Sequence, residues 1–122
     1  MKMILLVVEG RPEVRRRIVT TLDFPDFDLH EAEDGLRGLY LARGLGPQLV
    51  VLGEGLPGEP DGGEICARIK EDAALAYTRV LRLTAEGGDA DAKADACLCE
   101  PFSTRDLIDA VGRLLPRHEG EG

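Results

Sequence analysis

Residues 49–58, LVVLGEGLPG, carry the strongest fold signal in the chain. They join four consecutive apolar residues to a loop that contains three glycines. An uninterrupted apolar run is typical of a strand that is buried on both faces, as in a parallel sheet. The glycines follow the pattern G-x-G-x-x-G, which also occurs in the turn that binds the phosphates of a dinucleotide. A phosphate-binding turn runs directly into a helix, so the residues that follow distinguish the two interpretations.

The residues after this loop argue against phosphate binding. Prolines and glycines at positions 57, 60, 62 and 63 delay the next helix, so the loop amides do not belong to a helix end. Glu54 also places a negative charge where a phosphate would approach. We therefore predict a strand at 49–52, a long loop at 53–63 and a helix over 64–71.

Strand-like and helix-like segments alternate along the whole chain. Strands are predicted at 3–8, 29–32, 49–52, 80–83 (ending at Thr84) and 97–99. Apolar residues at helical spacing follow Pro12, Asp34 suits a helix N-cap, and Ser103-x-x-Asp106 has the form of a capping box. This alternation predicts one α/β domain, built on a doubly wound five-stranded parallel sheet with helices on both faces.

The connection between the fourth and fifth predicted strands is unusually short and weakly apolar. Residues 85–96 contain two glycines, and their only apolar side chains are alanines. A parallel crossover needs about a dozen residues, so this one is close to the minimum. We predict that the helix expected in this connection is shortened to one or two turns, or missing.

Composition and charge disfavour two classes of binding partner, nucleic acids and membranes. The chain has 122 residues and a formal net charge of -8, which disfavours a nucleic-acid-binding surface. No apolar segment approaches the length needed to span a membrane, so no membrane partner is expected. Three cysteines, Cys66, Cys97 and Cys99, favour reduced thiols in a cytoplasmic protein, and the last two are predicted to be small buried side chains of a strand. Residues 1–116 are predicted to form the domain and 117–122 a disordered tail.

Several stretches together resemble the receiver domain of response regulators, the CheY-like fold of bacterial two-component signalling. They are Met3–Pro12, Glu31–Gly35, Pro47–Leu52 with Leu56–Gly58 and Asp61-Gly62, Leu83–Ala85, and Glu100–Phe102. The resemblance implies the sheet order 2-1-3-4-5, with the functional site at the carboxyl ends of the strands. It also implies phosphoryl transfer from a partner histidine to an aspartate after the third strand, assisted by Mg²⁺.

The residues at the positions implied by this resemblance depart from the family pattern. The phospho-acceptor position is Gly53, the acidic pair that binds Mg²⁺ is Glu9-Gly10, and the conserved lysine is Glu100. The aromatic switch position is Cys97, while Thr84 is retained. A glycine offers no nucleophile, and too few carboxylates remain to hold Mg²⁺. We therefore predict a degenerate receiver with no metal site, no cofactor and no enzymatic activity.

The resulting hypothesis is an interaction module that acts without phosphorylation. It would bind a signalling protein, or a second copy of itself, near residues 97–99 and the final helix. One alternative is an active receiver whose acceptor has moved to Glu54 or Asp61. Another is a small-ligand sensor in the space left by Gly10, Gly53 and Gly55, where Glu9 and Glu100 would hold a cation or an amine, or where Arg82 would neutralise one of them.

Overall fold

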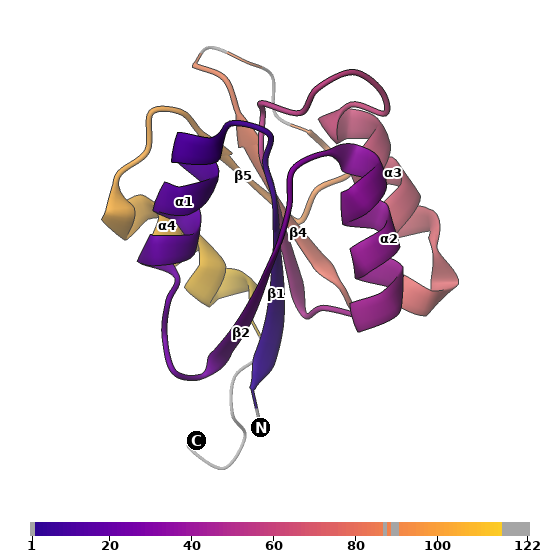
Figure 1. Cartoon of the computed structure of the whole chain (residues 1–122), viewed down its shortest axis with the longest axis horizontal. Helices are drawn as coiled ribbons and strands as arrows, with labels where there is room; N and C mark the ends of the chain where they lie inside the picture. Colours follow the sequence, from indigo (N-terminus) through magenta and orange to yellow (C-terminus); the bar gives the residue numbers. More distant parts are fainter. Residues whose placement is uncertain (1, 87, 89–90, 116–122) are drawn as a thin grey trace.

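The computed structural model describes residues 2–86, 88 and 91–115. Five parallel strands form one sheet in the order β2-β1-β3-β4-β5, which confirms the predicted fold class and strand order. The strands are β1 (Met3–Val8), β2 (Phe27–Ala32), β3 (Leu49–Leu52), β4 (Arg79–Thr84) and β5 (Ala96–Cys99). Figure 1 shows α1 and α4 on one side of the sheet and α2 and α3 on the other.

The apolar runs form the centre of the sheet because both faces of these strands are covered. Leu5 and Val7 of β1 pack in the core beneath α1 and α4, whereas Leu6 and Val8 pack beneath α2 and α3. Val7 lies opposite Val51 in the register of β1 with β3. All four residues of β3 are buried, as an apolar strand between two layers of helices requires.

Three of the four helices begin after a short polar side chain that caps them, whereas α1 begins at Pro12 without a side-chain cap. They are α1 (Pro12–Thr21), α2 (Gly35–Leu45), α3 (Gly62–Glu71) and α4 (Thr104–Leu114), with a short 3₁₀ turn, η1 (Ala73–Leu75), after α3. Asp34 accepts a hydrogen bond from the Arg37 backbone N–H, and Ser103 and Asp106 form the predicted capping box.

The predicted start of α3 was too late. Asp61 caps the helix by accepting a hydrogen bond from the Glu64 N–H, so the helix starts at Gly62 and not at residue 64. The prolines and glycines delay the helix less than we expected, because an N-cap aspartate offsets the poor helix propensity of Gly62 and Gly63.

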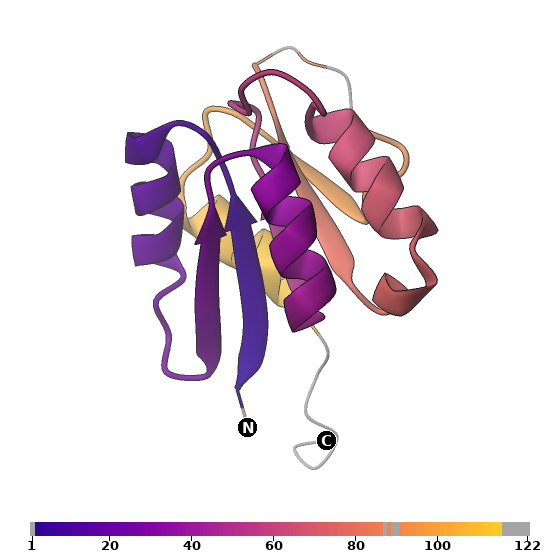
Figure 2. The ribbon, with the colours of Figure 1, turned by 45° about the vertical axis from the view of Figure 1, so that its right-hand side comes forward.

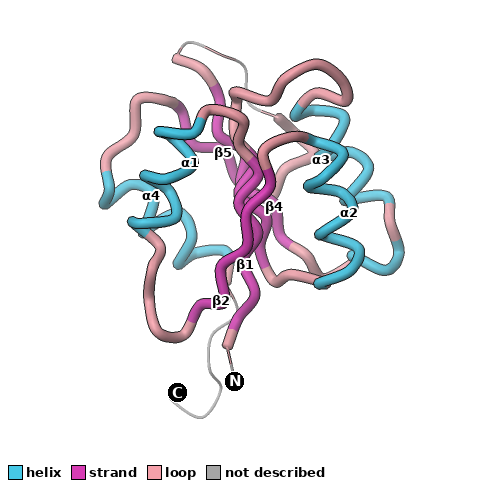
Figure 3. The backbone as a smooth tube through the Cα atoms, viewed as in Figure 1, coloured by secondary structure: helices cyan, strands magenta, loops and turns pink. Residues whose placement is uncertain are grey.

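The connection from β4 to β5 contains no helix in its described residues, 85, 86, 88 and 91–95, which agrees with the prediction (Figures 2 and 3). Side chains hold its second half on the sheet instead. Asp95 accepts a 2.7 Å hydrogen bond from the Val80 N–H and a 2.8 Å bond from Lys70. Asp91 forms an ion pair with Arg82 of β4 at 3.3 Å.

The missing cover changes the environment of β5. Cys97 and Cys99 are both exposed, so the prediction of buried thiols was wrong for these two residues, whereas Cys66 in α3 is buried. Burial of Cys66 and the charge of Asp91 raise the pKa of its thiol to about 11. The predicted tail, 117–122, lies outside the described residues, so the domain boundary stays a prediction.

Candidate functional site

The predicted site residues converge at the carboxyl edge of the sheet. Glu9 follows β1, Gly53 follows β3, Thr84 ends β4 and Glu100 follows β5. Glu9 is fully buried and Thr84 is nearly so, and the Thr84 carbonyl accepts a hydrogen bond from the Glu100 N–H. Cys97 is not part of this group. Its Sγ contacts the backbone of Asp91 instead.

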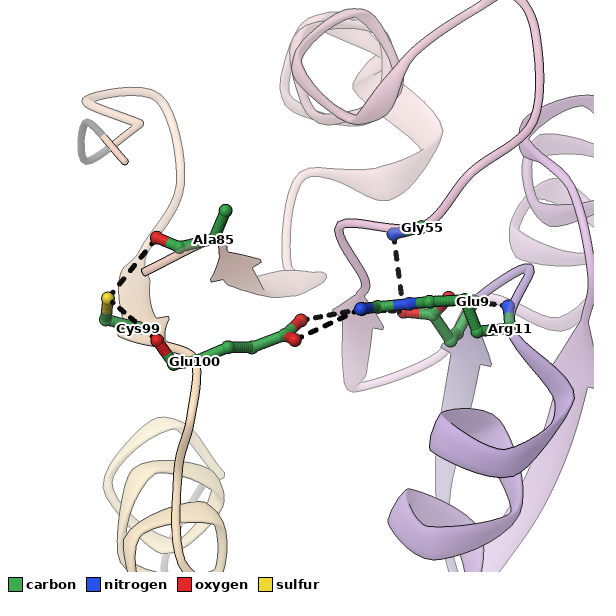
Figure 4. Close-up of polar contacts among 6 residues, drawn as sticks. All are labelled: Glu9, Arg11, Gly55, Ala85, Cys99 and Glu100. Atoms are coloured by element: carbon green, nitrogen blue, oxygen red, sulfur yellow. Dashed lines mark hydrogen bonds and ion pairs between the residues drawn. The ribbon is translucent and has the colours of Figure 1, made fainter. Parts of the chain in front are cut away.

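Arg11 connects the two acidic residues across this edge (Figure 4). Its Nε donates to Glu9 Oε2 at 3.1 Å and its Nη2 donates to Glu9 Oε1 at 2.9 Å. On its other side, Nη1 and Nη2 donate to the Glu100 carboxylate at 3.1 and 2.6 Å. One guanidinium therefore makes a two-bond contact with each of two carboxylates, the strongest geometry available to arginine. We call Glu9, Arg11 and Glu100 the arginine clamp.

Backbone groups fix the Glu9 end of the clamp. Glu9 Oε2 accepts a 2.7 Å bond from the Arg11 N–H, and Oε1 lies 3.5 Å from the Gly55 nitrogen. Burial alone would raise the pKa of Glu9, but the hydrogen bonds and the charge of Arg11 outweigh burial and lower the pKa from its ordinary value. The carboxylate of Glu9 is therefore ionised near neutral pH.

Two arginines of helix α1 add contacts that hold the same region in place. Arg15 donates a 2.8 Å hydrogen bond to the Glu9 carbonyl. Arg17 donates to the Phe102 carbonyl, and its guanidinium lies 4.8 Å from the centre of the Phe102 ring. The loop from β5 to α4 is thus held by Arg11, just before α1, at Glu100 and by Arg17 of α1 at Phe102.

The space beside the glycines of the site is filled, mainly by side chains of the clamp. A Cβ atom on Gly53 would overlap Glu9 Oε1 and lie 2.8 Å from Glu9 Cδ. A Cβ on Gly55 would lie 2.7 Å from Arg11 Cδ, and one on Gly10 would overlap the Gly55 carbonyl. The expected cavity at Gly10, Gly53 and Gly55 was therefore wrong, because Glu9, Arg11 and the facing backbone fill it.

Comparison with known proteins gives a consistent result, although no family model matches the sequence. RpaA of Synechocystis sp., a DNA-binding transcriptional regulator, is 32% identical over 93% of this chain and 49% of its own length. ResD of Bacillus subtilis, a transcriptional regulatory protein, is 31% identical over 93% of this chain and 48% of its own length. The chain thus spans about half the length of these relatives.

Solved structures agree over the full domain. A response regulator from Chloroflexus aurantiacus superposes with a TM-score of 0.84 and 26% identity, covering 96% of this chain and 100% of that one. The chain is a response-regulator receiver domain. CheY4 of Vibrio cholerae, at 21% identity and a TM-score of 0.83, shares the receiver fold over 94% of this chain and 100% of its own.

The divalent ion implied by the receiver family does not fit the residues present. Position 53 carries no carboxylate, position 10 is glycine, and both oxygens of Glu9 already accept hydrogen bonds from Arg11. Mg²⁺ requires near-octahedral oxygen ligands, which this arrangement does not offer while the guanidinium lies between the carboxylates. Among the described residues, no group of three or more His, Cys, Asp or Glu side chains is placed to hold a metal ion.

One other expectation about a site residue is corrected by the structure, and one site residue was missed. Arg82 pairs with Asp91 and neutralises neither Glu9 nor Glu100. The residue that neutralises both glutamates is Arg11, which the sequence analysis missed. An arginine after β1, a glutamate after β5 and glycines after β3 could have indicated this contact. A surface hollow of about 470 Å³ adjoins the clamp and is lined by Arg11, Arg17, Glu54, Glu86, Glu100 and Phe102.

The alternative acceptors, Glu54 and Asp61, are not part of the clamp. Glu54 is exposed at the rim of the hollow, and Asp61 is exposed as the cap of α3. Neither side chain makes a hydrogen bond with Arg11 in the described part of the chain.

No helix of the described chain has both the length and the apolar character needed to cross a membrane.

Proposed function

We propose that this receiver domain acts without phosphorylation, as a protein-interaction module of two-component signalling. The observation that carries the proposal is the overlap at Gly53: the Glu9 carboxylate occupies the space that an acceptor side chain would need. The position offers neither a nucleophile nor room for one.

The charges around the site support the same proposal. A phosphoryl group placed beside Gly53 would face the buried Glu9 carboxylate and the Glu100 carboxylate. Arg11 is the cation between them, and its hydrogen bonds already satisfy both. An added dianion would therefore be repelled and would have to break two charge-assisted contacts.

The edge at β5 is the surface that we propose for the partner. β5 pairs only with β4, so its outer edge is unpaired among the described strands. Cys97 and Cys99 are exposed on it, and Ile108 of the adjacent α4 is 36% exposed. A short edge strand beside partly exposed apolar side chains suits docking of a signalling protein or a second copy of this chain.

Phosphorylation is tested directly by mass spectrometry. The domain is incubated with acetyl phosphate and Mg²⁺, beside a receiver that carries the acceptor aspartate as the positive control. We expect no mass change, and no NMR shift of Gly53 with beryllofluoride. A stoichiometric gain of one phosphoryl group would refute the proposal. Glu54→Gln and Asp61→Asn variants would then identify a displaced acceptor, which is the alternative function.

The interaction surface is tested by sedimentation. If the partner is a second copy, we expect self-association to weaken in a Cys97→Asp/Cys99→Asp variant. Tyr40→Asp is the matched control, because Tyr40 is 70% exposed on α2, which packs on β1 and β2 and not on β5. Self-association that is unchanged by the β5 variant and lost in the control would place the interface elsewhere.

A further inference from the structure

The guanidinium of Arg11 lies between the two carboxylates of the clamp and binds both of them. Its Nη2 is 2.9 Å from Glu9 Oε1 and 2.6 Å from Glu100 Oε2. These two oxygens belong to residues 91 positions apart (100 − 9), and they converge because the carboxyl ends of parallel strands share one edge. Two anionic oxygens around one positive centre form the core of a cation site.

We propose that Arg11 is a built-in cation, which takes the place of the divalent ion used by receivers and makes this domain insensitive to such ions. The inference rests on the proposed function in one respect, since only a receiver that needs no metal-assisted phosphoryl transfer can dispense with the ion. Without the Arg11 side chain, Glu9 and Glu100 become a pair of carboxylates that binds a divalent cation, with Ca²⁺ preferred over Mg²⁺.

A tethered cation has the advantage over an ion in solution. Arg11 is held two residues from Glu9, and its own N–H donates to that carboxylate at 2.7 Å. Its effective concentration at the site is therefore high, and its binding to the carboxylates costs no translational entropy. Its planar fork also meets each carboxylate with two hydrogen bonds, whereas Mg²⁺ gives up its water reluctantly and needs near-octahedral ligands.

The preference for Ca²⁺ follows from the distances. The two carboxylate oxygens are spaced for a centre 2.6–2.9 Å away, whereas Ca²⁺ takes oxygen ligands at about 2.3–2.6 Å and Mg²⁺ at about 2.0–2.1 Å. Ca²⁺ also tolerates irregular coordination completed by water. A small inward movement of Glu100, whose side chain is 21% exposed, would close the remaining gap.

The test is thermal unfolding in the presence of CaCl₂, MgCl₂ or KCl at equal ionic strength. We expect the wild type to respond equally to all three salts. Arg11→Met keeps the apolar stem but removes the cation, and we expect CaCl₂ to raise its Tm by roughly 5 °C at about ten times the Kd. Adding Glu100→Gln to this variant should abolish that rise. Arg16→Met, at an exposed arginine of the adjoining helix α1, is the matched control and should behave as the wild type.

Arg11→Lys covers the case in which Arg11→Met does not fold. Lysine keeps the positive charge but cannot make a two-bond contact with each carboxylate, so we expect CaCl₂ to raise the Tm of Arg11→Lys but not that of the wild type. A wild type specifically stabilised by Ca²⁺ or Mg²⁺, or folded Arg11 variants that ignore both, would overturn the inference. Either result leaves the phosphorylation test untouched, and a phosphoryl gain by the wild type leaves the cation measurement valid.

Discussion

Gly53 is the residue on which the closed site depends, because its missing side chain makes room for Glu9. We predict that Gly53→Ala lowers the free energy of unfolding by roughly 1–3 kcal/mol, the usual cost of overpacking a buried site. Gly44→Ala is the control, since a Cβ on this exposed helical glycine meets nothing within 4 Å. It should be stabilising, by up to about 1 kcal/mol. Urea denaturation measures both, and equal stabilisation by both variants would show that Gly53 has unused space.

The charge of Glu9 gives the domain a defined acid sensitivity. Its folded-state pKa is lowered from the ordinary value of a glutamate, so its contribution to stability is complete above the unfolded-state pKa and is lost as the pH falls through the folded-state pKa. We predict that Glu9→Gln costs about 2 kcal/mol at pH 7, where Arg11 loses a buried partner. The difference from the wild type should shrink in acid, where Glu9 is itself protonated.

The comparison is made by denaturant unfolding from pH 7 down to the acid transition. Glu13→Gln removes an exposed carboxylate of α1 and serves as the control, with a small effect at every pH. A Glu9→Gln difference that stays constant through the acid range would mean that shape, and not charge, explains the role of Glu9.

At the residue scale, the sequence located the site but misjudged its contents. Glu9, Gly53 and Glu100 could be placed at one edge of the sheet because strand ends follow directly from the apolar pattern. Arg11 could not be placed so easily, because its contact with Glu100 depends on the side-chain path over the ends of β3 and β4. Gly53 and Gly55 leave room for that path. The glycine at position 53, which removes the acceptor side chain, is therefore also required by the clamp.

At the element scale, caps and periodicity predicted the helices well, while the segment from β4 to β5 was only partly predictable. Weak apolar content indicated that a helix would be short or missing there. What replaces it depends on a tertiary pair, Asp91 with Arg82, which no local pattern reveals. The exposure of Cys97 and Cys99 follows from the same cause, since a strand predicts burial only when both of its faces are covered.

The ion pair of Asp91 with Arg82 should fix the second half of this segment. Their side chains are 15% and 14% exposed, and Arg82 lies beside Gly62 at the positive end of α3. We predict that Asp91→Ala leaves the cation uncompensated there, costs about 2–3 kcal/mol and speeds hydrogen exchange of the Ala94 and Asp95 amides. Lys93→Ala, an exposed neighbour, is the control. Unchanged exchange in Asp91→Ala would assign the anchoring to Asp95 alone.

At the scale of the whole molecule, excess negative charge opposes compaction. The 23 acidic and 15 basic residues give a formal net charge of -8, and the isoelectric point is about 4.7. Salt screens the repulsion, with a Debye length of about 10 Å at 0.1 M. We predict that KCl raises the Tm at pH 7 and that this effect disappears near pH 4.7. A Tm that falls with KCl at pH 7 would show that local ion pairs outweigh the net repulsion.

The clamp also makes the loss of phosphorylation a property of several residues at once. An aspartate at position 53 would meet Glu9 and would have its charge taken up by Arg11, which already serves Glu100. We predict that Gly53→Asp alone gains no phosphoryl group from acetyl phosphate and Mg²⁺. Glu9→Asp/Arg11→Ala/Gly53→Asp/Glu100→Lys supplies the nucleophile, frees two carboxylates for Mg²⁺ by removing the built-in cation, and restores a separate cation, so partial modification is expected in this variant although position 10 stays glycine. Intact mass compares the two proteins after circular dichroism has confirmed that each is folded. Modification of Gly53→Asp alone would mean that the missing nucleophile is the single barrier and that Glu9 and Arg11 move aside without cost.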